Sequence, residues 1–215
     1  MNFFGHAAVA TWRSTEPAFV LGAMLPDFAT MLGTRPPGVE GDDLAAGVAF
    51  HHETDRVFHD TVTFRRLQLD ARRALREMGL PRPSALAVGH IGVEILLDGR
   101  LAEDAHAVAA YLGALARAGD ADCARRIAWN DEALRSGFAT LSSTLLDRGV
   151  TPATRSAERA AFRVTRALAT RPRLRLTAEG EAIVRVWAAA SEHLVADAAS
   201  ELMTELRRGL SLAPR

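Results

Sequence analysis

The chain of 215 residues is 48% hydrophobic and 24% charged, which is typical of a globular protein of about one domain. Its 26 basic and 26 acidic residues balance, so the charge gives no reason to expect nucleic acid as a partner. All 26 basic residues are Arg, which excludes catalysis by a P-loop lysine, a Schiff-base lysine or a lysine general base.

The cysteine content and the hydropathy limit the possible metal ligands and the expected cellular location of the protein. The single cysteine, Cys123, excludes an intramolecular disulfide and a cysteine-rich zinc site, so any metal must be held by His and carboxylates. No stretch reaches the roughly 18 apolar residues that a transmembrane span needs, and no positively charged region precedes a long apolar stretch near the N-terminus. We therefore expect a cytoplasmic protein without a transmembrane segment.

The composition is rich in Ala, Leu and Arg and poor in β-branched residues, which predicts an all-α fold, a single-domain helical bundle over residues 1–215. A Pro/Gly-rich loop is expected over 33–43, and Asp27 is expected in a turn after Pro26. Ser84 is expected to cap the helix that follows it. In chain order, the pattern predicts helices at 3–12, 17–25, 43–79 with a break near 60–63, 85–98, 103–118, 120–127, 130–147, 154–170 and 178–209.

Polar side chains interrupt the apolar face of the helix predicted from Asp43. The apolar positions Leu44 and Val48 continue at helical spacing onto His51, Asp55 and then His59. These three residues follow one another at intervals of four, so we expect them on one face of the helix, with neighbouring side chains able to reach a common ion.

The helix predicted over 85–98 is apolar or Gly apart from His90, Glu94 and Asp98, again at intervals of four. A helix that is apolar on nearly all sides is normally central to its bundle, so His90 and Glu94 are expected to enter the interior. A buried carboxylate needs a compensating partner, and a divalent cation is one such partner. A buried Arg–carboxylate network, with Arg56 or Arg100, is the alternative.

Further metal ligands are expected from the N-terminal region, where His6 and Asp27 lie in apolar surroundings. Mixed imidazole and carboxylate ligands suit Mn²⁺, Mg²⁺, Fe²⁺ or Zn²⁺. The number of candidates favours two ions, the arrangement used for phosphoester hydrolysis. The predicted ligand set is His6, Asp27, His51, Asp55, His59, His90 and Glu94.

At these residues the chain resembles the acyl carrier protein phosphodiesterase family. The resemblance rests on the segments NFFGH (2–6), GAMLPDF (22–28), GVAFHHETD (47–55) and GHIGVEILLDGRL (89–101), and covers roughly the first 100 residues. It implies an all-helical, HD-domain-like metal phosphohydrolase that releases 4′-phosphopantetheine from holo acyl carrier protein with Mn²⁺ or Mg²⁺. The family usually has an acid at the position of His59 and two acids at those of His90 and Glu94, and arginines at those of His52 and Glu53.

The hypothesis also assigns roles to three further residues and leaves three alternative functions to compare. His52 or Asp98 is expected to donate a proton or to orient a ligand, and Arg56 to contact the substrate phosphate. The early His, the Pro-Asp element and the later His pair also resemble zinc-dependent phospholipase C type hydrolases. A non-catalytic helical protein with a structural metal or ion-pair site is the alternative outside enzymes. A di-iron oxidoreductase is disfavoured, because no Glu-x-x-His motif occurs among the candidates.

Overall fold

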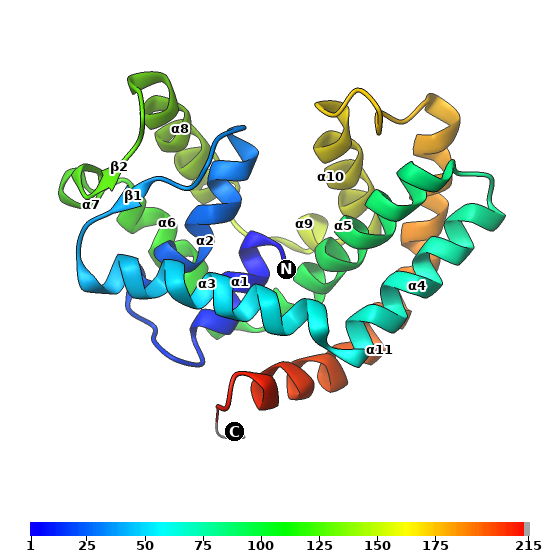
Figure 1. The fold of residues 1–215 in the computed structure, drawn as a ribbon, viewed down its shortest axis with the longest axis horizontal. Helices are drawn as coiled ribbons and strands as arrows, with labels where there is room; N and C mark the ends of the chain where they lie inside the picture. The colour runs from blue at the N-terminus through cyan, green and yellow to red at the C-terminus, as the bar shows by residue number, and fades with distance from the viewer. Residues whose placement is uncertain (213–215) are drawn as a thin grey trace. The chain divides into compact units, whose positions relative to one another are not determined.

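The computed structural model describes residues 1–212 and confirms the all-α fold (Figure 1). Eleven helices and two strands of two residues each form in this part of the chain. None of the helices in residues 1–212 has the length and apolar character needed to cross a membrane.

Two compact units divide the chain. Unit 1 comprises Met1–Arg56 and Leu101–Val150, and unit 2 comprises Val57–Arg100 and Thr151–Arg215. Helix α3 (Asp42–Asp60) contributes residues to both units. Each unit is described below by itself.

Unit 1 is built around helix α1, all of whose residues are buried. Helix α2 packs against both α1 and α6, and α8 packs against α6. Two short strands pair antiparallel, with Gly38 opposite Ala128. The elements of this unit beside α3 are α1 (Phe3–Ala10), α2 (Pro17–Met31), β1 (Gly38–Val39), α6 (Ala105–Ala118), α7 (Ala121–Arg125), β2 (Ile127–Ala128) and α8 (Glu132–Arg148).

Helices α2 and α3 cross at backbone contact, because each has a glycine at the crossing. A Cβ atom on Gly22 would lie 2.3 Å from the carbonyl oxygen of Leu44, and one on Gly47 would lie 2.1 Å from that of Phe19. Only glycine permits this approach. The crossing fixes the spacing between Asp27, on α2, and His51, on α3.

In unit 2, helix α11 packs against both α4 and α10. A glycine also marks the contact of α5 with α11, since a Cβ on Gly92 would lie 2.5 Å from the ring of Trp187. Glu205 of α11 accepts hydrogen bonds from the amide and the hydroxyl of Thr63, in the first turn of α4. The elements of this unit beside α3 are α4 (Val62–Glu77), α5 (Arg82–Leu101), α9 (Pro152–Arg155), α10 (Ala157–Ala169) and α11 (Ala178–Gly209).

The structure corrects four of the expected boundaries. Helix α2 continues through Pro26 to Met31, so Asp27 lies within a helix rather than in a turn. A proline inside a helix loses one backbone hydrogen bond, but almost all of α2 between 18 and 29 is buried, and this packing retains the helix.

Helix α5 begins at Arg82, before the expected cap Ser84. The helix expected at 120–127 is shorter and forms α7. The helix expected at 154–170 is divided into α9 and α10. The expected break near 60–63 is confirmed, because the Thr61 hydroxyl caps α4 by accepting from the amide of Phe64.

Candidate metal centres

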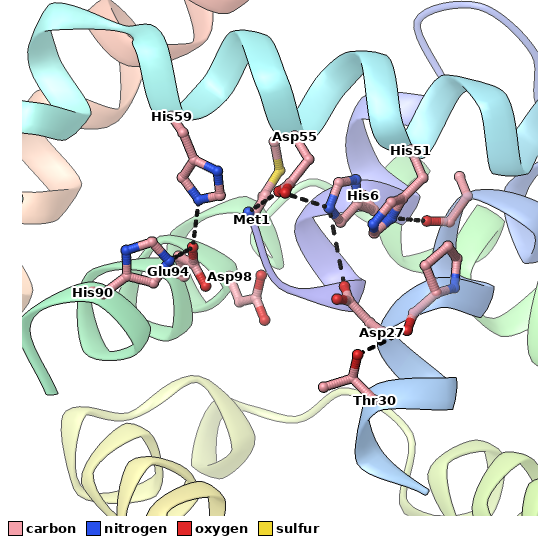
Figure 2. Close-up of polar contacts among 12 residues, drawn as sticks. Met1, His6, Asp27, Thr30, His51, Asp55, His59, His90, Glu94 and Asp98 are labelled. Carbon is pink, nitrogen blue, oxygen red and sulfur yellow. Dashed lines mark hydrogen bonds and ion pairs between the residues drawn. The ribbon is translucent and has the colours of Figure 1, made fainter. Parts of the chain in front are cut away.

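Three predicted ligands of unit 1 converge from three helices. His6 of α1, Asp27 of α2 and His51 of α3 each offer a ligand atom, and these atoms lie within 4.8 Å of one another (Figure 2). The imidazole rings of His6 and His51 stack with their centroids 3.8 Å apart, and His6 Nε2 lies 4.0 Å from Asp27 Oδ2. His6 is 1% exposed and His51 is 6% exposed, so the imidazoles are withdrawn from solvent.

The tautomer of His51 is set by the backbone of α2. Its Nδ1 lies 2.9 Å from the carbonyl oxygen of Ala23, which only accepts, so Nδ1 carries the proton and Nε2 carries a lone pair. Burial, together with the adjacent His6, lowers the pKa of His51 to about 3. His51 is therefore neutral over the physiological pH range, which is the form that ligates metals.

Asp55 lies beside this group without being one of its three members. Its Oδ1 is 3.6 Å from His6 Nε2 and 2.7 Å from the amino group of Met1. Asp55 therefore contacts the group through His6.

Three predicted ligands of unit 2 form a second group, consisting of His59 of α3 with His90 and Glu94 of α5. The Nε2 atoms of His59 and His90 both lie 3.1 Å from the same oxygen of Glu94, Oε1 (Figure 2). The side chain of Glu94 is 10% exposed, whereas those of His59 and His90 are 32% and 38% exposed. The expected burial is thus confirmed for Glu94, and His90 is half-buried.

Two residues of α4, Gln68 and Phe64, contact this group. Gln68 Nε2 of α4 lies 2.6 Å from His90 Nδ1, and the buried ring of Phe64 packs against both imidazoles. Burial by itself raises the pKa of Glu94, but the hydrogen bonds from His59 and His90 oppose it, and the pKa lies below its ordinary value. Glu94 is therefore ionised at neutral pH.

The candidates on α3 are divided between the two groups, with His51 in the first and His59 in the second. The expectation that His51, Asp55 and His59 share one face is imprecise for a physical reason. Each step of four residues turns a helix by about 400°, so the direction drifts by about 40° per step and by about 80° over eight residues. Side chains at the two ends of such a series face different neighbours.

The remaining predicted residues lie outside both groups. Asp98 is buried on α5 and accepts a hydrogen bond of 3.1 Å from Arg163 Nη2 of α10. Its expected role as a proton donor or as the residue that orients a ligand stays a prediction. His52 and Arg56 are exposed on α3, and the His52 ring meets that of His51 edge-on. Gln68 and Arg163 could not be predicted from the sequence, because a single polar residue on an amphipathic helix does not indicate which residue it contacts.

Comparison of the chain with models of protein families found no match. Comparisons with curated proteins and with solved structures found none either.

Proposed function

We propose that the protein is a metal-dependent phosphoester hydrolase. The observation that supports this most directly is the convergence of two imidazoles and one carboxylate in each unit, with ligand atoms within 4.8 Å of one another. Three protein ligands of this type leave coordination positions for substrate and water on a divalent ion. The chemistry that such an ion supplies is Lewis-acid activation of a phosphoryl oxygen and of the attacking water.

The two groups differ in how a substrate would reach them. His6 and His51 are buried, so a substrate has no direct access to these imidazoles. His59 and His90 are each about one third exposed, and a phosphoester can approach them from solvent. We therefore assign substrate binding to the group of unit 2 and support of the fold to the group of unit 1.

The proposed substrate is the phosphodiester that joins 4′-phosphopantetheine to holo acyl carrier protein. This choice is supported by the resemblance of residues 2–6, 22–28, 47–55 and 89–101 to the corresponding family. The four segments include all seven predicted ligands except His59.

The test begins with the metal content of the full chain after loading with Mn²⁺, followed by hydrolysis of bis-p-nitrophenyl phosphate and of holo acyl carrier protein. Glu94→Ala should lose an ion and turnover while keeping the helical circular-dichroism spectrum, and His51→Ala should lose an ion. His193→Ala and His106→Ala are matched controls, because both histidines are exposed. A protein that binds Mn²⁺ through these residues but hydrolyses neither substrate is not a hydrolase of this kind, and its ions are structural.

A further inference from the structure

One segment of unit 2 carries a large excess of positive charge. Residues 152–175 contain seven arginines and one acidic residue, Glu158, although the charges of the whole chain balance. The segment comprises α9, α10 and most of the connection from α10 to α11. A local excess of this size produces a positive surface potential, which attracts an anionic partner and raises the rate of its association.

Three of these arginines are not neutralised by a neighbouring acid. The side chains of Arg166, Arg171 and Arg173 are exposed, and within residues 1–212 they form no ion pair. Arg163, by contrast, donates to the buried carboxylate of Asp98. The charges of the three exposed arginines therefore remain available to another molecule.

The turn that follows α10 holds two of them in place. The amides of Leu174 and Arg175 donate to the carbonyl oxygen of Arg171, at 2.8 and 3.0 Å. Arg175 Nε donates to the carbonyl oxygen of Ala169, the last residue of α10, at 3.2 Å. Arg171 and Arg173 thus lie in a hydrogen-bonded turn at the C-terminal end of α10, which lowers the entropy cost of binding through them.

An exposed aromatic ring lies on the same helix. Phe162 is 50% exposed, and it is not needed for the buried face of α10, which consists of Ala157, Ala160, Ala161, Val164 and Leu168. The guanidinium carbon of Arg159 lies 4.7 Å from the centroid of the Phe162 ring. Arg166 follows Phe162 by four residues, so it lies one turn further along the same side of the helix. An aromatic ring among arginines is typical of the centre of a protein–protein interface.

From these observations we propose that Phe162, Arg166, Arg171 and Arg173, the basic face, bind an acidic surface of another protein. None of the four belongs to either group of metal ligands, so the inference goes beyond the proposed function and does not depend on it. Carboxylates of the partner pair with the three arginines, and an apolar side chain of the partner covers the Phe162 ring.

Two observations favour a protein over a nucleic acid or a membrane. Sites for single-stranded nucleic acid stack successive bases on aromatic side chains, whereas Phe162 is the single aromatic residue of 152–175 and Arg159 covers one face of its ring. A helix that lies in a membrane surface has a broad apolar face. Among residues 157–169, by contrast, Phe162 is the one large hydrophobic residue that is exposed.

The test measures, by fluorescence anisotropy, how the full chain binds a synthetic helical peptide that carries Glu around a stripe of Leu. The same peptide with Gln in place of Glu is the control ligand. The charge variant is Arg166→Gln/Arg171→Gln/Arg173→Gln. Its matched control removes the same charge from three other exposed arginines and is Arg73→Gln/Arg82→Gln/Arg148→Gln. Phe162→Ala is matched by Leu69→Ala, because Leu69 is 47% exposed on α4.

The charge variant should bind the Glu peptide roughly 10- to 100-fold more weakly at low ionic strength, and its affinity should depend less on salt. Phe162→Ala should bind roughly 10-fold more weakly while keeping the native salt dependence. Both controls should bind like the native chain, and the Gln peptide should not bind.

Failure of the native chain to bind the Glu peptide, or equal losses in the charge variant and its control, would overturn the inference. Oligothymidylate and phosphatidylglycerol vesicles are measured with the same variants. If either bound more tightly than the peptide and lost this binding in the charge variant, the basic face would belong to a nucleic acid or a membrane instead of an acidic protein.

Discussion

The glycine crossing of α2 and α3 gives a quantitative prediction for Gly47→Ala. The added Cβ would lie 2.1 Å from the carbonyl oxygen of Phe19, whereas ordinary contact begins at 3.4 Å, so the helices must separate by about 1.3 Å. Overpacking of this kind costs about 1–3 kcal/mol, and a backbone carbonyl cannot rotate away as a side chain can. The helix propensity of Ala returns about 1 kcal/mol. We expect a net loss of up to about 2 kcal/mol, which corresponds to a decrease in Tm of up to about 4–8 °C for a chain of this length.

The control for this substitution is Gly113→Ala in α6, where an added Cβ meets no atom within 4 Å. This variant should be more stable than the native chain by up to about 1 kcal/mol, because only helix propensity changes. Thermal and urea unfolding of metal-free protein, followed by far-UV circular dichroism, measures both variants. If Gly47→Ala were as stable as Gly113→Ala, the close crossing of α2 and α3 would be wrong.

The same variant tests the connection from packing to metal binding. Asp27 and His51 lie on the two helices that Gly47→Ala forces apart. In a Glu94→Ala background, where the second group lacks its carboxylate, the remaining Mn²⁺ affinity should fall with Gly47→Ala and should not change with Gly113→Ala. Unchanged affinity would show that the spacing of α2 and α3 does not set the first site.

Three further predictions concern single side chains. Because the pKa of His51 falls from 6.5 to about 3 on folding, the unfolded chain binds more protons between these pH values, and metal-free protein should lose about 2 kcal/mol between pH 7.5 and 5. Urea unfolding at the two pH values measures this loss, and in His51→Asn its contribution should disappear. Gln68→Ala should weaken Mn²⁺ binding by roughly 10-fold or more because it releases His90 Nδ1, whereas the exposed Arg73→Ala should have no effect in the same titration. Gly92→Ala should cost up to about 2 kcal/mol, after about 1 kcal/mol of helix propensity is subtracted, and alter tryptophan fluorescence, since its Cβ would meet the Trp187 ring at 2.5 Å. An unaltered spectrum and stability would contradict that contact.

Much of the helical organisation was predictable from local signals. The longest helix, α11, was expected at 178–209 and is found there, with the Thr177 hydroxyl accepting from the amide of Gly180. The break between α3 and α4 was also expected. Pro26 misled the prediction because local sequence shows the missing N–H of proline but not the burial that compensates for it.

The candidate sites were predictable in their residue types and not in their grouping. The apolar surroundings of Glu94 predict that it is buried, and it is. Periodicity on one helix gives the direction of a side chain but not the identity of the opposing helix. It therefore could not separate His51 from His59, nor predict that Gln68 contacts His90 and that Arg163 contacts Asp98.

The hydrogen bonds of the second group show what a metal ion would have to displace. Glu94 only accepts, so His59 and His90 each donate from Nε2 to its Oε1, and Gln68 donates to the Nδ1 of His90. Ligation through Nε2 requires each proton to move to Nδ1, and for His90 the Gln68 amide must turn so that its oxygen accepts. The buried carboxylate is thus compensated by imidazoles before any ion arrives, and its charge does not depend on metal for stability. Removing the ion from this group should therefore abolish activity without unfolding unit 2, which is the behaviour of an exchangeable catalytic site rather than of a structural one.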